Sequence, residues 1–120
     1  AAATANGLYP HVEIYGDDYD TKDGTAIRNY THIKDIVNSI YNIILQKPIT
    51  NYECLGSKNN YSVLEIIKIM EQISGKEIKK VFKERRLGDS ATSIINKSLY
   101  FKETNTIHDQ CLSALSVEID

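Results

Sequence analysis

Apolar residues recur at steps of three and four between positions 32 and 46, and this pattern constrains the fold more than any other feature of the chain. They are Ile33, Ile36, Val37, Ile40, Tyr41 and Ile44. Such spacing places the side chains on one face of an α-helix. Pro48 cannot continue a helix, so it marks the stop. The pattern predicts an amphipathic helix from about His32 to Gln46.

A second helix is indicated by residues at its two ends. Ser62 and Glu65 have the spacing of a capping box, and Gly75 supplies a C-terminal stop. The apolar face between these ends consists of Val63, Ile66, Ile67, Met70 and Ile73. A weaker helical pattern runs from Thr106 to about Val117.

Short apolar runs predict strands over Val12–Tyr15, Asn51–Leu55 and Ile78–Phe82, and Ala26–Tyr30 is a further extended segment. Polar stretches over 17–25, 57–60 and 85–90 read as loops. The order strand, helix, strand, helix, strand is that of an α/β fold.

Composition excludes several classes of protein. The chain has 120 residues, of which 42% are hydrophobic and 25% charged, as expected for a single globular domain. A net charge of −2 gives no general attraction to nucleic acid or to anionic membranes. No apolar run approaches the roughly 20 residues of a membrane span, and the first residues lack a signal-peptide pattern. For Cys54 and Cys111, two reduced core thiols of a cytoplasmic protein are favoured over a disulfide or a metal pair.

The segment Arg85-Arg86-Leu87-Gly88-Asp89 is the sharpest local candidate for ligand binding. A guanidinium fork can hold two oxygens of a pyrophosphate, and Gly88 lets the backbone approach a ligand closely. Asp89 can accept hydrogen bonds from ribose hydroxyls or orient an arginine. Taken alone, the segment is better explained as a solvated basic turn at the end of a strand.

Arg28 follows an acidic loop and has two explanations of equal weight. It is a second candidate for a phosphate ligand. Alternatively, it forms a salt bridge to one of the nearby carboxylates, which are Asp17, Asp18, Asp20 and Asp23.

Two apparent motifs do not fit the chemistry they suggest. An EF-hand loop counted from Asp18 fails at positions 5, 6 and 12, so the acidic run predicts a polar hairpin rather than a calcium site. The spacing Tyr30-x-x-x-Lys34 resembles a dehydrogenase pair, but Tyr30 precedes the predicted helix and the two side chains would not share a face. The three histidines have no metal-ligand spacing, and His32 is expected to cap or pack.

In their order along the chain, the motifs between Val12 and Asp89 resemble a UDP-glucose 4-epimerase. They are a strand ending in aromatic-Gly, then Asp-Tyr-x-Thr-x-Asp-Gly-Thr, Arg-x-Tyr-x-His-x-x-Asp at a helix start, a strand ending in Leu-Gly, the helix start Tyr-Ser-Val-Leu-Glu, and Arg-Arg-x-Gly-Asp. The resemblance implies an α/β chain that is the C-terminal, substrate-binding portion of an extended short-chain dehydrogenase/reductase, lacking most of the Rossmann domain.

The family resemblance also implies roles for four residues. Tyr15 would lie against the uracil, Arg28 and Arg86 would hold the pyrophosphate, and Asp89 would bind the ribose. In the complete enzyme, NAD takes a hydride from C4 of the UDP-sugar and returns it to the other face. Residues 1–120 would then form a partial UDP-sugar-binding region.

The glycine-rich NAD fingerprint, the catalytic Ser/Thr and the catalytic Tyr-x-x-x-Lys pair of the family are missing from this chain. We expect the chain alone to bind no NAD and no metal and to be inactive, and its start at Ala1 suggests a fragment. The alternative is a non-catalytic UDP-sugar-binding remnant or a decayed gene product.

The expected partners are a UDP-sugar and either a second copy or a chain supplying the missing Rossmann half. Nucleic acid and membrane are not expected partners. Without the missing half, the 32–46 helix would expose its apolar face and the 51–55 strand an edge.

Overall fold

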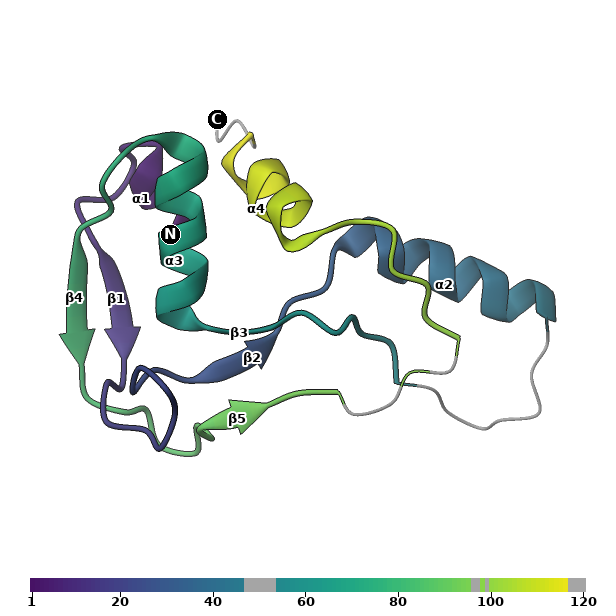
Figure 1. The fold of residues 1–120 in the computed structure, drawn as a ribbon, viewed down its shortest axis with the longest axis horizontal. Coiled ribbons are helices and arrows are strands. Elements are labelled where there is room, and N and C mark those ends of the chain that lie inside the picture. Colours follow the sequence, from purple (N-terminus) through teal and green to yellow (C-terminus); the bar gives the residue numbers. More distant parts are fainter. Residues whose placement is uncertain (47–53, 96–97, 99, 117–120) are drawn as a thin grey trace.

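A parallel pair of strands and a group of three helices form one end of the molecule. The computed structural model describes residues 1–46, 54–95, 98 and 100–116. Strand β1 (Val12–Tyr15) pairs in parallel with β4 (Lys80–Lys83). Helix α3 (Val63–Ser74) lies beside this pair, α1 (Ala2–Ala5) lies near one end of α3, and α4 (Ile107–Leu115) packs on α3 on the side away from the strands (Figure 1). The predicted α/β class is confirmed.

A second, three-stranded sheet continues from the first. Its central strand β2 (Ile27–Asn29) pairs antiparallel with β3 (Asn60–Ser62) and parallel with β5 (Thr92–Ser93). The loop after β1 leads into β2, and the loop after β4 leads into β5, so both loops turn between the two sheets (Figure 1). None of the described helices has the length and apolar content that a bilayer crossing requires.

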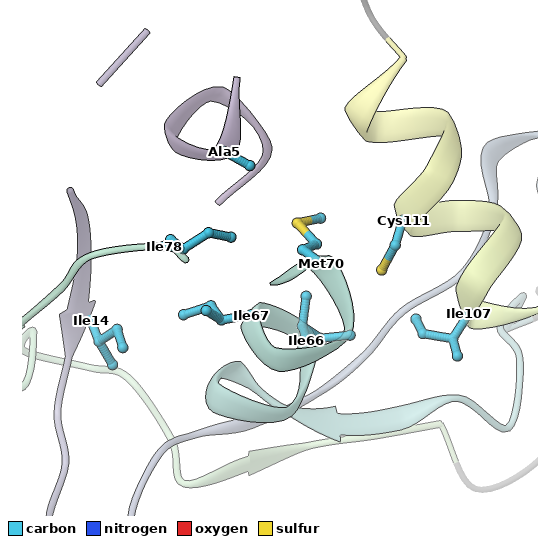
Figure 2. Packing of buried hydrophobic residues seen from close by; sticks show 8 residues of the cluster. All are labelled: Ala5, Ile14, Ile66, Ile67, Met70, Ile78, Ile107 and Cys111. Atoms are coloured by element: carbon cyan, nitrogen blue, oxygen red, sulfur yellow. The ribbon is translucent and has the colours of Figure 1, made fainter. Parts of the chain in front are cut away.

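The core lies between the first sheet and α3 and continues between α3 and α4 (Figure 2). Its buried members are Ala5, Ile14, Ile66, Ile67, Met70, Ile78, Ile107 and Cys111 (Figure 2). They come from α1, β1, α3, α4 and the approach to β4. Burying each large aliphatic side chain contributes roughly 1.5–3 kcal/mol, so this cluster is the main stabilising element of the described fold.

The predicted ends of α3 are confirmed in detail. The Ser62 hydroxyl accepts a hydrogen bond from the Glu65 N–H at 3.1 Å, and the Glu65 carboxylate accepts one from the Ser62 N–H at 2.8 Å. These reciprocal bonds satisfy two donors that the first turn would leave unpaired. Gly75 ends the helix with a φ of 67°, in the left-handed region.

Helix α2 (Ile33–Gln46) has the predicted length, but it points its polar side inward. Asp35 and Ser39 are its two buried residues, each 1% exposed. The Asp35 carboxylate accepts hydrogen bonds from the N–H groups of Thr104 and Asn105 and from both of their side chains, at 2.5–3.1 Å. The Ser39 hydroxyl accepts the Lys102 N–H at 3.4 Å. These bonds attach α2 to the segment 102–105, and Figure 1 shows the helix extending away from the helix group.

Three predictions need correction or completion. The strand predicted over 78–82 begins at Lys80, because the Ile78 N–H donates to the Glu71 carboxylate at 3.0 Å instead of joining a ladder. Of the strand predicted over 51–55, residues 51–53 lie outside the described residues, and Cys54 and Leu55 are not in a strand. The short elements α1, β3 and β5 were not predicted.

Both described cysteines are free thiols, but they occupy different environments. Cys111 is buried in the core, as expected, and burial raises the pKa of its thiol. Cys54 is exposed, so the expectation of two core thiols is wrong. The reason is that Cys54 lies outside the helices and strands that enclose the core.

Asp35 should make stability depend on pH. Burial alone would raise the pKa of Asp35, but the hydrogen bonds from Thr104 and Asn105 outweigh it and lower the pKa from 3.8 to about 2. Because the folded-state pKa is the lower one, the stabilisation is complete above the unfolded pKa and is lost as pH falls through about 2.

We therefore expect Asp35→Asn to lower the free energy of unfolding at pH 7 by about 2 kcal/mol. Near pH 2 the difference from wild type should shrink. Urea unfolding at both pH values measures the difference in free energy of unfolding. Asp20→Asn, which changes an exposed carboxylate, is the control. Equal pH profiles for wild type and Asp35→Asn would contradict the role assigned to this carboxylate.

Candidate functional site

The candidate site lies where β1 and β4 end. Tyr15 is opposite Lys83 in the parallel register, and the Gly16 N–H continues the ladder to the Lys83 carbonyl at 2.9 Å. Because parallel strands end at the same edge, Tyr15 and the Arg85–Asp89 segment come together although they are distant in sequence. The carboxyl edge of parallel strands is a common place for ligands in α/β proteins.

Three of the four predicted site residues are in contact there. The Arg86 guanidinium lies over the Tyr15 ring, 4.9 Å from its centroid, and its Nε donates to Asp89 Oδ2 at 2.9 Å. The Asp89 N–H also donates to the Arg86 carbonyl at 3.2 Å, closing the turn that Gly88 permits with a φ of 89°. The Arg86 side chain is 64% exposed, so it is held in place yet open to a ligand.

The Tyr15 ring is fixed at its hydroxyl end. Its O–H donates to Glu13 Oε2 at 2.6 Å, from the preceding outward position of the same strand. This bond raises the pKa of Tyr15 and lowers the pKa of Glu13. The ring therefore stays protonated and oriented at neutral pH, with the arginine on one face.

Arg28 does not share these contacts. It lies on β2, opposite Tyr61 in β3 and Ser93 in β5, and its Nη1 donates to the Ile27 carbonyl at 2.9 Å. Among the described residues it forms no salt bridge, so the predicted alternative of a bond to the acidic loop is wrong. Asp18, one of the predicted partners, is bonded to Arg85 instead.

Arg85 is the residue whose role the sequence did not reveal. Its Nε donates to Asp18 Oδ1 at 2.7 Å and its Nη2 to the Asp18 carbonyl at 2.5 Å, while its guanidinium lies 4.2 Å from the Tyr19 ring centroid. These contacts join the loop after β1 to the loop after β4. Two adjacent arginines thus stack on two tyrosines spaced four apart. This paired spacing is the sequence feature from which the role of Arg85 could have been predicted.

Gly16 allows the two loops to come together at the end of β1. A Cβ at Gly16 would lie 2.5 Å from the Tyr19 ring and 3.1 Å from Arg85 Cγ, and its φ of 99° is one that L residues rarely adopt. Only glycine therefore fits between the end of β1 and the Arg85–Tyr19 pair.

The acidic loop is a structural connection rather than a metal site. Asp23 Oδ1 accepts from the Thr25 N–H and hydroxyl at 2.9 and 2.7 Å, and Asp23 Oδ2 accepts from the Ser62 hydroxyl. The loop is thereby bonded to the N-terminus of α3. Across the described ranges, no three His, Cys, Asp or Glu side chains gather as metal ligands.

Two other expectations concern the start of α2. His32 is buried and its Nδ1 accepts the Lys34 N–H at 3.1 Å, so it caps the helix as predicted. Tyr30 precedes the first helical residue, Ile33, so Tyr30 and Lys34 are not one turn apart on a helix. The rejection of this pair as a catalytic one is consistent with the structure.

The residues present do not fit a dinucleotide cofactor. Pyrophosphate binding by a Rossmann fold requires a strand that turns through a glycine-rich sequence directly into a helix. The sequence contains no Gly-x-Gly-x-x-Gly. At the carboxyl ends of β1 and β4 the chain enters loops that lead to strands, not helices.

Comparison with proteins of known sequence identifies relatives. The chain is 38% identical over 122 residues to the UDP-glucose 4-epimerase of Bifidobacterium longum, covering 96% of this chain and 36% of the relative. It is 39% identical over 95 residues to that of Bacillus subtilis, covering 76% of this chain and 28% of the relative. No protein-family model matches the chain.

Solved structures agree with the sequence relatives. The B. longum epimerase structure with NAD+ and UDP superposes with a TM-score of 0.83 at 37% identity, covering 95% of this chain and 36% of the other. The Stenotrophomonas maltophila epimerase, with NAD and a formylated UDP-arabinopyranose, gives 0.85 at 30% identity over the same shares. The chain is therefore homologous to a C-terminal portion of UDP-glucose 4-epimerases, and it spans about a third of their length.

Gly16→Ala should weaken the junction between the two loops. The added methyl must displace Tyr19 or Arg85, and overpacking of this kind typically costs about 1–3 kcal/mol. Gly7→Ala is a matched control, since its φ is 82° but nothing lies within 4 Å of the new Cβ. Urea unfolding should show a larger loss for Gly16→Ala than for Gly7→Ala. Equal losses would mean that backbone strain, and not the contact with Tyr19, sets the requirement for glycine.

Proposed function

We propose that this chain is the UDP-binding portion of a UDP-glucose 4-epimerase-type protein and that it holds the UDP moiety at Tyr15, Arg86 and Asp89, with Arg28 as a second phosphate ligand. The observation that carries the proposal is the state of Arg86. Its guanidinium is exposed and oriented by a ring and a carboxylate at the carboxyl edge of parallel strands.

Arg86 has the chemistry that a pyrophosphate requires. Its Nε is occupied by Asp89, and the Arg86 side chain forms no other hydrogen bond among the described residues. The two terminal nitrogens can then donate to two phosphate oxygens at once. A hydrogen bond between charged groups contributes about 1.5–3 kcal/mol.

Tyr15 and Asp89 supply the remaining contacts. Tyr15 is 38% exposed, which leaves part of its ring to lie against the uracil. Asp89 uses Oδ2 for Arg86, and its Oδ1 remains to accept from a ribose hydroxyl. Asp89 therefore both orients the arginine and recognises the sugar.

Arg28 has a smaller part in the proposed site. It is half-buried on β2 and its Nη1 is bonded to a backbone carbonyl, so only its remaining N–H groups are available to a phosphate. Because Arg86 is the more exposed of the two arginines, it is the principal ligand. The structures similar to this chain that carry UDP or a UDP-sugar support a nucleotide as the ligand class.

The proposal assigns no chemistry to the chain alone. Residues 1–120 are a partial UDP-sugar-binding region that interconverts UDP-glucose and UDP-galactose only with an added NAD-binding part, in cytoplasmic galactose metabolism. Here the chain's own residues bind and orient the nucleotide; hydride transfer needs the cofactor that they do not fit. A non-catalytic UDP-sugar-binding role is the second candidate, and the exposed Arg86 beside Tyr15 supports it equally.

Titration of the chain with UDP tests the binding role. Two arginine contacts without a closing pocket give an expected Kd on the order of millimolar. Arg86→Ala should weaken binding by about 10- to 150-fold, which puts it beyond detection. Lys79→Ala, which removes an exposed cation outside the site, should leave the Kd unchanged. Binding is measured by the changes in NMR chemical shifts on addition of UDP. Equal binding by wild type and Arg86→Ala would contradict the proposal.

An epimerase assay tests the absence of chemistry. We expect no conversion of UDP-galactose by the isolated chain in the presence of NAD, because no residue here forms the hydride-carrier site. Conversion above the buffer rate, retained after repurification, would overturn the assignment as a binding portion only.

A further inference from the structure

The side chain of Arg85 is fixed at three points by the loop that follows β1. Its Nε donates to Asp18 Oδ1 at 2.7 Å, its Nη2 donates to the Asp18 carbonyl at 2.5 Å, and its guanidinium lies 4.2 Å from the centroid of the Tyr19 ring. Because the guanidinium is planar, all three contacts form together in only one orientation. The proposed function uses the neighbouring Arg86 and gives Arg85 no part.

The loop that receives Arg85 is itself attached to the fold. The Tyr19 side chain is buried, and the Tyr19 N–H donates to the Gly24 carbonyl at 2.9 Å, which closes the loop on itself. Further along, the Asp23 carboxylate accepts a hydrogen bond from the Ser62 hydroxyl at the N-terminus of α3. Arg85 is therefore bonded to a loop that is anchored to a core helix (Figure 1).

The ion pair of Arg85 and Asp18 contributes little to the stability of the fold. The two side chains are 46% and 72% exposed, and solvent screens pairs as exposed as this one. The hydrogen bond from Arg85 lowers the pKa of Asp18, so the carboxylate is charged at neutral pH. The effect of the pair is therefore mainly geometric, because it sets the direction of the Arg85 side chain.

We propose that Arg85 is a positioning residue for UDP, which holds Arg86 against Tyr15 and Asp89 before the nucleotide binds. One peptide joins the two arginines, so their Cα atoms are about 3.8 Å apart. Fixing the Arg85 side chain restricts the backbone from which Arg86 extends to the Tyr15 ring and to Asp89 Oδ2. The role of Arg85 depends on the proposed UDP binding by Arg86.

Arg86 needs such support because its own contacts are few. Its side chain is 64% exposed, and its one hydrogen bond among the described residues goes to Asp89, three residues further along the same loop. Ordering a long side chain at the moment of binding weakens affinity by about two- to tenfold. Arg85 removes part of this cost in advance, since the backbone of Arg86 is already fixed.

Proton exchange at the Arg86 side chain tests the positioning directly. The hydrogen bond to Asp89 protects the Arg86 Nε–H from exchange with water, so the exchange rate, measured by NMR on the chain without nucleotide, reports how firmly Arg86 is held. Arg85→Lys keeps the charge but loses the planar fork, and it should raise this rate at least about threefold. Lys79→Gln, which removes an exposed cation elsewhere, is the control and should leave the rate unchanged.

Substitutions of Tyr19 test the stacking contact separately. The Tyr19 hydroxyl is buried and has no hydrogen-bond partner among the described residues, so the ring alone supports Arg85. Tyr19→Leu should raise the exchange rate of the Arg86 Nε–H, and the conservative Tyr19→Phe should restore it. Where Tyr19→Leu does not fold, Arg85→Lys decides, since Arg85 is at an exposed position.

Titration with UDP completes the test. Arg85→Lys should weaken binding by about two- to tenfold, which is less than the loss expected for Arg86→Ala, while the urea midpoint changes little. A residue that only joined the two loops would leave both the Kd and the Arg86 exchange rate unchanged.

The possible results separate the two proposals. An unchanged Arg86 exchange rate in Arg85→Lys overturns the positioning role, and weaker UDP binding alongside it would make Arg85 a direct ligand instead. Faster exchange with an unchanged Kd also overturns it. Faster exchange in Arg85→Lys, together with no UDP binding by wild type, contradicts the proposed function and leaves the coupling of Arg85 to Arg86 in place.

Discussion

The parallel pairing of β1 with β4 is the contact on which the rest of the structure depends. It places Val12 beside Lys80 and Tyr15 beside Lys83, joining two segments that are otherwise far apart along the chain. The core packs on one side of it through Ile14 and Ile78. The loops that carry the candidate site leave from its carboxyl edge. Because the pair has only two strands and buries one aliphatic from β1, it relies on the α3 helix to stay in place.

The site is built from two arginine–tyrosine stacks with different tasks. Arg85 joins the loops through Asp18 and Tyr19, and Arg86 stays exposed beside Tyr15 and Asp89. The first stack fixes the backbone from which the second arginine extends. The contact of Arg85 with Asp18 is exposed, so forming it requires little desolvation of the two charges. It also restricts the conformational freedom of the neighbouring Arg86, which faces the ligand.

Features set by local bonding could be predicted from the sequence. The capping box of Ser62 and Glu65, the stop at Gly75 and the cap at His32 need only neighbouring residues. The β1 bounds were also correct. Contacts between distant segments could not be predicted. The sequence offers Asp18 as one partner of Arg28, whereas in the structure Asp18 bonds Arg85. The strands β3 and β5 are too short to show any periodicity, and Ile78 lies outside its predicted strand because Glu71 takes its N–H.

The attachment of α2 by Asp35 and Ser39 has a consequence for how the chain opens. The bonds that hold this helix are polar and lie outside the aliphatic core, so breaking them removes no core contact. Local opening of α2 therefore leaves the contacts of the core in place. Thermal fluctuation would release α2 first while α3, α4 and the strand pair remain folded, so the chain can present a loosely held apolar helix without unfolding the loops that carry Arg86.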